Sequence, residues 1–249
     1  PHAIGWKSVA VNLSDIAAMG AKPQSILLAL SLPQIDHNWL KAFSQGLYDC
    51  CDQFGVSLIG GDTTQSPHLT LSVTALGWVD IGHAIPRSGA QIGDLICVSG
   101  TVGDAAFALN HLGHPLQKRL DYPTPRCALG QALKGLANSM IDISDGLAQD
   151  LGHILKASNV GAKLNLDQLP LSPVLQNLSH EQQWQYALAG GDDYELCFTI
   201  SPHKHEQLLQ QQLDVQITTI GTITAIQTLS FQHHGKDCML NLSGYQHFA

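Results

Sequence analysis

Apolar residues in the first part of the chain are spaced as alternating helices and strands would require. They recur at helical intervals in the segments 6–19 and 39–54, each of which is followed by Gly. The segments 25–32, 56–59 and 69–79 are short and either apolar throughout or alternating, which is typical of strands. This succession predicts a mixed α/β architecture in which strands run in both directions.

A polar stretch rich in Gly, residues 80–94, interrupts this succession and indicates a domain junction. Beyond it, apolar spacing predicts strands at 95–99, 140–143, 194–200 and in the tail from 216, and helices at 103–112, 126–137, 146–157, 182–188 and 203–212. We therefore expect an α/β protein with mixed sheets and two domains, an N-terminal one at 1–91 and a C-terminal one at 92–249.

Composition and charge narrow the range of functions. The 249 residues are 44% hydrophobic and 13% charged, which is a globular composition. The net charge is −8 and no cluster of Lys and Arg occurs, so we expect no nucleic-acid partner. No apolar stretch is long enough to cross a bilayer, and no signal peptide opens the chain, so we expect no membrane association. The six cysteines form no C-x-x-C pair, which indicates reduced thiols in the cytoplasm.

The start of the chain is abrupt. It opens with Pro1 in place of Met and enters a predicted helix almost at once. Domains rarely begin in this way, so we expect that the N-terminal domain is truncated and that an upstream segment belongs to the intact protein.

Three acidic motifs carry the candidate chemistry. Asp15 borders the apolar face of the first predicted helix. Asp62 follows Gly61, and paired glycines directly after a strand let the backbone approach a bulky ligand. Asp142 and Asp145 lie where a strand turns into a helix. Carboxylate oxygens are the ligands that Mg²⁺ prefers, and one or two per ion suffice beside phosphate oxygens, so these aspartates predict a site for several Mg²⁺ ions and a nucleotide.

The third motif also offers groups for phosphate. Alternation along a strand puts Asp142 and Ser144 on one face, and Asp145 then stands at a helix start, where the dipole favours a carboxylate or a phosphate. Arg87, in a Pro-Arg-Ser-Gly segment, offers a guanidinium fork for a phosphate group.

Taken singly, each of these features has an ordinary structural explanation. Asp145 before Gly is a common turn or helix cap, Asp15 alone would be a solvated helix residue, and Arg87 alone would be a surface residue in a linker. His233 and His234 are expected to be a loop pair and no ligand site. Only the joint pattern favours phosphoryl transfer, and spacing alone does not say that the motifs meet in space.

Five motifs in a fixed order resemble a known family. They are VNLSDIAAMG at 11–20, GGDTT at 60–64, RSGA at 87–90, IDISDGL at 141–147 and GGDDYEL at 190–196. This pattern resembles the thiamine-monophosphate kinase family, which belongs to the superfamily of aminoimidazole ribonucleotide synthetase. The resemblance covers the chain from about residue 3 to its end, and the first and fourth motifs are the most specific.

The resemblance implies the two-domain fold of that superfamily, a homodimer built on N-terminal strands, and ATP bound between the domains. It implies that ATP phosphorylates thiamine monophosphate to thiamine diphosphate by direct in-line transfer with Mg²⁺ and without a protein nucleophile. By position, it implies metal ligands at Asp15, Asp62, Asp142 and Asp145, nucleotide contacts at Gly61, Asp62, Arg87 and Ser144, and substrate contacts at Asp192 and Tyr245.

Two departures from the family pattern stand out. Asp192 replaces the usual Glu and is one methylene shorter. The upstream metal-binding and substrate-binding segments of the family are absent from the sequence, so we expect this fragment alone to be inactive or nearly so. Two alternatives stay open at this point: another ATP-dependent enzyme of the superfamily, such as a selenophosphate synthetase, and a dimer that binds nucleotide or thiamine phosphate without catalysis.

Overall fold

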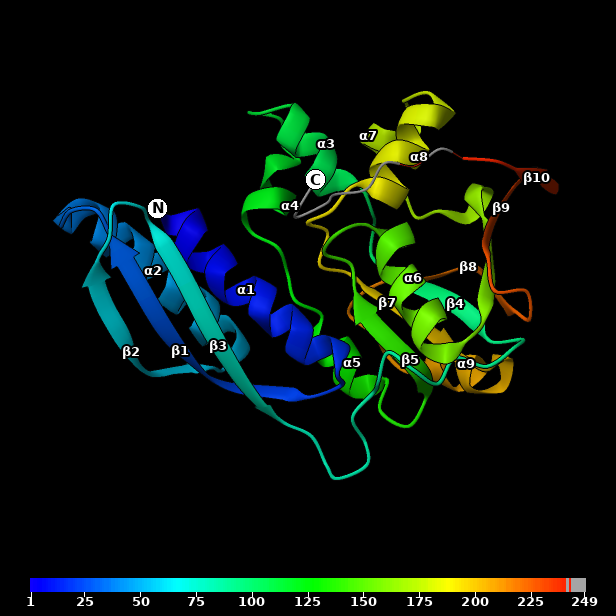
Figure 1. Ribbon diagram of the computed structural model, residues 1–249, viewed down its shortest axis with the longest axis horizontal. Coiled ribbons are helices and arrows are strands. Elements are labelled where there is room, and N and C mark those ends of the chain that lie inside the picture. The colour runs from blue at the N-terminus through cyan, green and yellow to red at the C-terminus, as the bar shows by residue number, and fades with distance from the viewer. Residues whose placement is uncertain (241, 243–249) are drawn as a thin grey trace.

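Two sheets lie side by side along the long axis of the molecule (Figure 1). The computed structural model describes residues 1–240 and 242. The smaller sheet has the strand order β2-β1-β3, and the larger one has the order β10-β9-β6-β8-β4-β7-β5. Strands pair in parallel at β1–β2 and β6–β9 and antiparallel elsewhere, which confirms the predicted α/β fold with mixed sheets.

The elements follow the predicted order with some differences in their bounds. The strands are β1 (Lys22–Leu32), β2 (Ser57–Gln65), β3 (Thr70–Trp78), β4 (Leu95–Ser99), β5 (Ala137–Asp142), β6 (Gly161–Asn165), β7 (Leu196–Ile200), β8 (Ile217–Thr224), β9 (Leu229–His233) and β10 (Lys236–Cys238). The helices are α1 (His2–Ala18), α2 (His37–Phe54), α3 (Asp104–Asn110), α4 (Gln117–Asp121), α5 (Cys127–Ala132), α6 (Leu147–Ser158), α7 (Pro173–Gln176), α8 (His180–Ala189) and α9 (Pro202–Leu209), with a 3-10 turn η1 (Leu166–Gln168).

Three local predictions were wrong. The helix expected at 126–137 ends at Ala132, because the chain turns through Gly135 in a left-handed conformation and then enters β5. Strand β2 does not stop before the paired glycines but runs through them to Gln65. The segment between α6 and α8, expected to be a connector, contains β6, which lies between β9 and β8 in the larger sheet. Its short GAKLN run is apolar only in part, so its spacing does not predict a strand.

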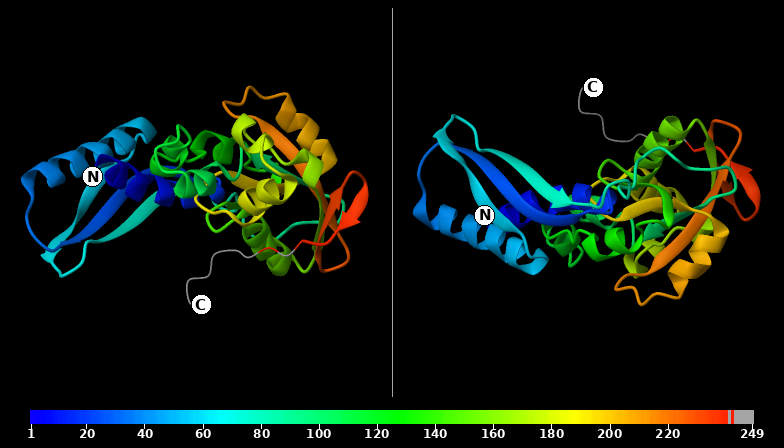
Figure 2. Two further views of the ribbon diagram at one scale, coloured as in Figure 1. Left: turned by 90° about the horizontal axis from the view of Figure 1, so that it is seen from above. Right: turned by 90° about the horizontal axis from the view of Figure 1, so that it is seen from below.

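Helices α1 and α2 pack together closely against the smaller sheet. A Cβ atom at Gly5 would collide with the carbonyl oxygen of Phe43, and one at Gly46 would collide with that of His2, so glycine at both positions permits the close approach. The side chains of Val9, Leu13 and the other residues on that stripe of α1 are fully buried. In Figure 2, no helix among the described residues covers the opposite face of this sheet.

Helix α1 also joins the two halves of the molecule. The hydrophobic cluster that contains its residue Leu13 extends through Leu129 of α5 to Phe198 of β7 in the larger sheet. A Cβ atom at Gly130 would collide with the carbonyl oxygen of Ala17, so α5 lies directly on α1. Because α1 carries Asp15, this shared core fixes Asp15 relative to the end of β5. Among the described residues, no helix is both long and apolar enough to span a bilayer.

Candidate active site

Asp142 lies at the centre of the candidate site. It is the last residue of β5 and is 4% exposed. Burial raises its pKa to about 6; the nearby Ser14 hydroxyl opposes this shift, and the negative charges of Asp15 and Asp150 add to it. The Ser14 oxygen is buried and lies close to Asp142 without the geometry of a hydrogen bond. A buried carboxylate beside other carboxylates and an orphaned hydroxyl is an arrangement that a bound cation would stabilise.

Asp15 and Arg87 share a cavity with Asp142. This cavity has a volume of about 250 Å³. Asp15 is accessible to solvent at the cavity wall, yet partial burial raises its pKa, and the positive charge of Arg87 opposes that shift. Arg87 comes from the segment between the two sheets, and none of the ion pairs found among the described residues engages it. The structure thus brings together two of the predicted metal ligands and one predicted nucleotide contact.

A second cavity, of about 430 Å³, contains the other predicted residues of this region. Ser144, Asp145 and Asp192 line it, with Tyr194 and part of α3. The Tyr194 hydroxyl donates to an Asp192 carboxylate oxygen at 2.9 Å. Burial raises the pKa of Tyr194, and the nearby negative charges of Asp192, Asp142 and Asp15 raise it further.

The backbone at the start of α6 is held by a residue that the sequence reading missed. One carboxylate oxygen of Asp150 accepts hydrogen bonds from the N–H groups of Ser144, Asp145 and Gly146 at 3.0–3.1 Å. The sequence predicts that the start of this helix favours the Asp145 carboxylate or a phosphate, whereas in the structure Asp150 accepts from all three N–H groups. An acidic residue in the first turn of a helix is the signal that could have identified Asp150. Its role is to fix the backbone so that Ser144 and Asp145 face the larger cavity.

The loop that carries Asp192 is strained and tied to the same backbone. Asp192 and Tyr194 have φ angles of 69° and 51°, a left-handed conformation that residues other than Gly rarely adopt. The Asp192 N–H donates to the carbonyl of Ser144 at 2.9 Å, and the Tyr194 N–H donates to that of Ile143 at 2.8 Å. Lys7 of α1, which the sequence reading also missed, forms an ion pair with Asp192 at 3.1 Å.

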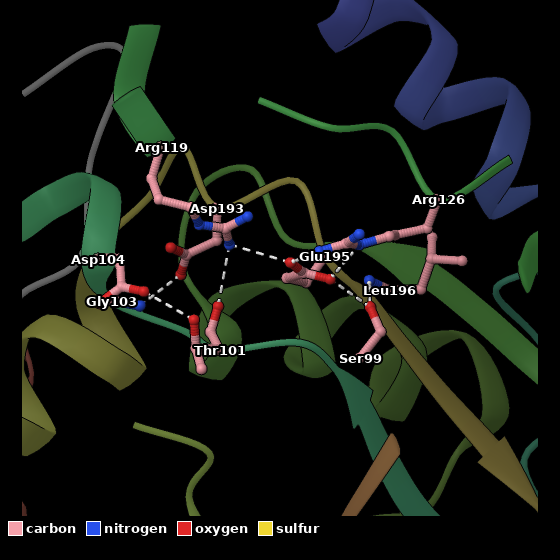
Figure 3. Close-up of polar contacts among 9 residues, drawn as sticks. All are labelled: Ser99, Thr101, Gly103, Asp104, Arg119, Arg126, Asp193, Glu195 and Leu196. Atoms are coloured by element: carbon pink, nitrogen blue, oxygen red, sulfur yellow. Dashed lines mark hydrogen bonds and ion pairs between the residues drawn. The ribbon is translucent and has the colours of Figure 1, made fainter. Parts of the chain in front are cut away.

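A network of ion pairs and hydrogen bonds holds Asp193 and Glu195, the neighbours of Asp192 and Tyr194 in this loop (Figure 3). Arg119 and Arg126 approach Glu195 from opposite sides, with nitrogen–oxygen distances of 2.9 Å for Arg119 and 2.5 and 2.7 Å for Arg126. The Ser99 hydroxyl donates to the same carboxylate at 2.6 Å. Asp193 accepts from the Gly103 N–H at 2.7 Å, and burial raises its pKa to about 8.

The loop alternates between inward and outward residues. Asp193 and Glu195 are 2% and 0% exposed, whereas Asp192 and Tyr194 line the cavity. Because both outward residues have left-handed φ angles, no strand-like period in the sequence separates these roles.

Two predicted residues lie apart from this cluster in the single chain. Gly61 and Asp62 are on β2, the edge strand of the smaller sheet, and both are exposed. Asp62 accepts a hydrogen bond from the Thr63 N–H at 2.9 Å and contacts none of the other predicted ligands in the interactions described. A Cβ atom at Gly61 would collide with the Leu28 carbonyl, so a glycine at this position also allows close strand pairing. Tyr245 lies outside the described residues.

Comparison with known proteins identifies both halves of the chain. The model of the AIR synthase related protein N-terminal domain matches residues 1–79, and that of the AIR synthase related protein C-terminal domain matches residues 93–234. The fold is also shared with hydrogenase maturation protein HypE in complex with ATP, at 17% identity and a TM-score of 0.81. At this identity the likeness shows the fold alone.

Relatives with a higher sequence identity show the family more specifically. The thiamine-monophosphate kinases of Escherichia coli K12 and Haemophilus influenzae are each 46% identical over 265 residues, with 100% of this chain and 81% and 80% of theirs covered. The crystal structure of thiamine-monophosphate kinase from Stenotrophomonas maltophilia has a TM-score of 0.88 at 45% identity, covering 95% of this chain and 80% of that one. A structure described as AaThiL complexed with AMPPCP and TMP has a TM-score of 0.85 at 30% identity, covering 100% of this chain and 81% of that one. The chain therefore belongs to the thiamine-monophosphate kinase family of AIR synthase related proteins.

Proposed function

We propose that the protein transfers the γ-phosphoryl group of ATP to thiamine monophosphate and so forms thiamine diphosphate. The observation that carries this proposal is that Asp15 and Asp142 line one cavity while Ser144 and Asp145, directly beyond Asp142 in the chain, line a second one with Asp192. The family relationship supports it, and the relative bound to AMPPCP and TMP holds an ATP analogue together with the acceptor substrate.

Asp15, Asp62, Asp142 and Asp145 are the proposed ligands of several Mg²⁺ ions. The donor set fits Mg²⁺, because it consists of hard carboxylate oxygens, and Asp142 is buried among like charges that a cation would relieve. When bound, the ions neutralise phosphate charge and align the transferred group. The protein's own part is to hold Asp15, Asp142 and Asp145 in place, through the α1 core and the hydrogen bonds that Asp150 accepts from the 144–146 backbone.

The remaining contacts are divided between the two substrates. Arg87, Ser144 and Gly61 are the proposed contacts for the nucleotide, and Arg87 faces the carboxylate-lined cavity with a fork suited to phosphate. Asp192 and Tyr245 are the proposed contacts for thiamine phosphate. Asp192 is shorter than the usual Glu, but Lys7 lies 3.1 Å from its carboxylate and adds a positive charge where a substrate phosphate would arrive.

Transfer needs no protein nucleophile. A substrate phosphate oxygen attacks the γ-phosphorus of ATP in line, the bond from that phosphorus to the β–γ bridging oxygen breaks, and ADP leaves. The residues named above bind, orient and screen charge during this step, which is where phosphoryl-transfer enzymes gain most of their rate.

A second copy of this chain is the proposed partner, and the open face of the smaller sheet is its site. Large apolar side chains are exposed on that sheet, with Ile59, Leu76 and Trp78 at 58%, 46% and 70%. Unpaired backbone groups along the edge strand β2 would also find partners in a dimer. Leu76→Lys should shift the protein to monomer in light scattering, and an unchanged mass would exclude this face.

The proposal also includes a domain boundary and a cellular compartment. We place the domain boundary at residues 91 and 92, within the segment that connects β3 of the smaller sheet to β4 of the larger one. We place the protein in the cytoplasm, because its cysteines are free thiols and all but Cys238 are buried.

Product analysis with ATP and thiamine monophosphate tests the reaction. Formation of thiamine diphosphate and ADP supports the proposal. Binding of both ligands without that product would instead favour a non-catalytic binding protein. In a parallel assay with ATP and selenide, formation of selenophosphate would favour the other superfamily activity.

Asp62→Asn tests the most remote proposed ligand. It should lower turnover while leaving the unfolding transition of the chain unchanged, because Asn keeps the oxygen that accepts from the Thr63 N–H. Unchanged turnover at saturating Mg²⁺ would remove Asp62 from the site without affecting the rest of the proposal.

A further inference from the structure

A second cluster of ligand-type side chains lies in the larger sheet, outside the phosphoryl-transfer cleft. Asp167 belongs to the 3-10 turn η1, and His233 and His234 stand at the turn from β9 to β10. Each offers one ligand atom, and these three atoms all lie within 4.8 Å of one another. The sequence reading treated the two histidines as an ordinary loop pair, because nothing in the local sequence brings Asp167 to them.

The distances within the cluster suit a shared cation. The Nε2 atom of His233 lies 3.4 Å and the Nδ1 atom of His234 lies 3.1 Å from the same Asp167 oxygen, Oδ1. Ligands at about 2.0–2.1 Å from a tetrahedral Zn²⁺ ion are separated by about 3.3 Å. The His233 Nε2 atom is also buried and has no hydrogen-bond partner among the described residues. A buried ring nitrogen without a partner is costly, and a metal ion in the cluster would satisfy it.

The cluster is preorganised by contacts that leave its ligand atoms free. The His234 N–H donates to the other Asp167 oxygen, Oδ2, at 2.7 Å, so Oδ1 points toward the rings. His234 and Gly235 have φ angles of 50° and 74°, and this tight turn places the His234 ring over that of His233, with centroids 3.9 Å apart. The Trp184 ring packs edge-on against His233 at 5.0 Å and fixes its orientation.

The cluster is also accessible and differs chemically from the cleft. Asp167 and His233 line a cavity of about 330 Å³, and the His234 side chain is 74% exposed. None of the ion pairs found among the described residues joins Asp167 to Lys or Arg, so its charge is not already neutralised by a fixed cation. Two imidazoles and one carboxylate suit Zn²⁺ and other divalent transition metals, whereas Mg²⁺ prefers oxygen ligands.

We propose that Asp167, His233 and His234 form a binding site for one divalent transition-metal ion of the Zn²⁺ type, with a fourth position open to water. The site joins η1 to the β9–β10 hairpin at one end of the larger sheet and is separate from the proposed phosphoryl-transfer residues. It does not depend on the proposed kinase activity.

Direct titration with Co²⁺ and Zn²⁺ tests this site. The full chain is titrated in excess Mg²⁺, which occupies oxygen-rich sites, and the visible absorption of bound Co²⁺ reports nitrogen ligation. We expect one ion per chain, displacement of Co²⁺ by Zn²⁺, and a higher melting temperature with Zn²⁺. Absence of binding, or a Co²⁺ spectrum typical of all-oxygen coordination, would overturn the proposal.

Two variants and two controls locate the ion. His234→Asn keeps a residue that tolerates the left-handed turn, and Asp167→Asn keeps an acceptor for the His234 N–H, so both should fold. Each should weaken Zn²⁺ binding by more than about tenfold, since losing even an outer-shell partner costs about 10–100-fold. His68→Ala, at an exposed loop histidine, and Asp142→Asn, in the cleft, should leave Zn²⁺ affinity within about twofold. Equal affinity in all four variants would show adventitious binding elsewhere and exclude this site.

Discussion

Replacement of Glu195 by Gln should destabilise the protein severely without changing the size of the side chain. The Glu195 carboxylate is 1% exposed and accepts hydrogen bonds from Arg119, Arg126 and Ser99. Gln removes the negative charge and presents an amide N–H₂ group to guanidinium donors. Two partly buried guanidinium groups then lose their partner, and breaking a buried ion pair in this way costs about 3–5 kcal/mol.

The expected change in melting temperature follows from the size of the chain. At about 2.1 cal/mol/K per residue, 249 residues have an unfolding entropy of about 0.5 kcal/mol/K. A loss of about 3–5 kcal/mol therefore corresponds to a fall of about 6–10 °C in melting temperature. Urea denaturation followed by circular dichroism measures the free energy of unfolding, and calorimetry measures the melting temperature.

The matched control is Glu206→Gln, at an exposed position on α9, which should change the free energy of unfolding by less than about 0.5 kcal/mol. Because Glu195 also anchors the loop that carries Asp192, Glu195→Gln should raise KM for thiamine monophosphate at temperatures where the variant is folded. A free energy of unfolding for Glu195→Gln within about 1 kcal/mol of the wild type would refute the view that this network supports the cleft.

Three further predictions concern the aspartates around the cleft. Asp142→Asn should abolish Mg²⁺-dependent turnover, because it removes a proposed metal ligand. Burial raises the pKa of Asp142 from 3.8 to about 6, so at pH about 8 without Mg²⁺ the variant should be more stable than the wild type by about 3 kcal/mol. Rate assays and melting curves check the two effects, and a destabilised variant would contradict the second. Asp193 has a pKa raised from 3.8 to about 8, so the stability linked to its proton is complete below pH about 4 and is lost as the pH rises through about 8. Asp193→Asn should flatten this decline in urea titrations across that range, and an unaltered slope would argue against a buried neutral carboxyl group. Asp150→Ala leaves three backbone N–H groups without their acceptor, so it should lower the free energy of unfolding by about 1–3 kcal/mol and raise KM for ATP. Asp150→Asn keeps an oxygen acceptor and should change both quantities less. Equal effects of the two variants would mean that the hydrogen bonds do not position the turn.

The amino-acid sequence by itself determined the fold class, the order of most elements and the family. Helix α1 and strand β1 follow from local periodicity, because an apolar stripe every three or four residues, or a short apolar run, can be buried in only a few ways. The sequence did not reveal β6, since five residues with a central Lys carry too little periodicity, and the strand forms only between two neighbours in the sheet.

Only the tertiary structure decided which acidic residues share a site and what each one does. Asp15 and Asp142 are far apart in the chain, and the packing of α1 on the larger sheet brings them to one cavity. Asp145 and Asp150 look equivalent in the sequence, but the turn before α6 directs its N–H groups to Asp150 and leaves Asp145 facing the cavity. The same reason explains the cluster at Asp167, because contacts between distant segments depend on packing that no local pattern encodes.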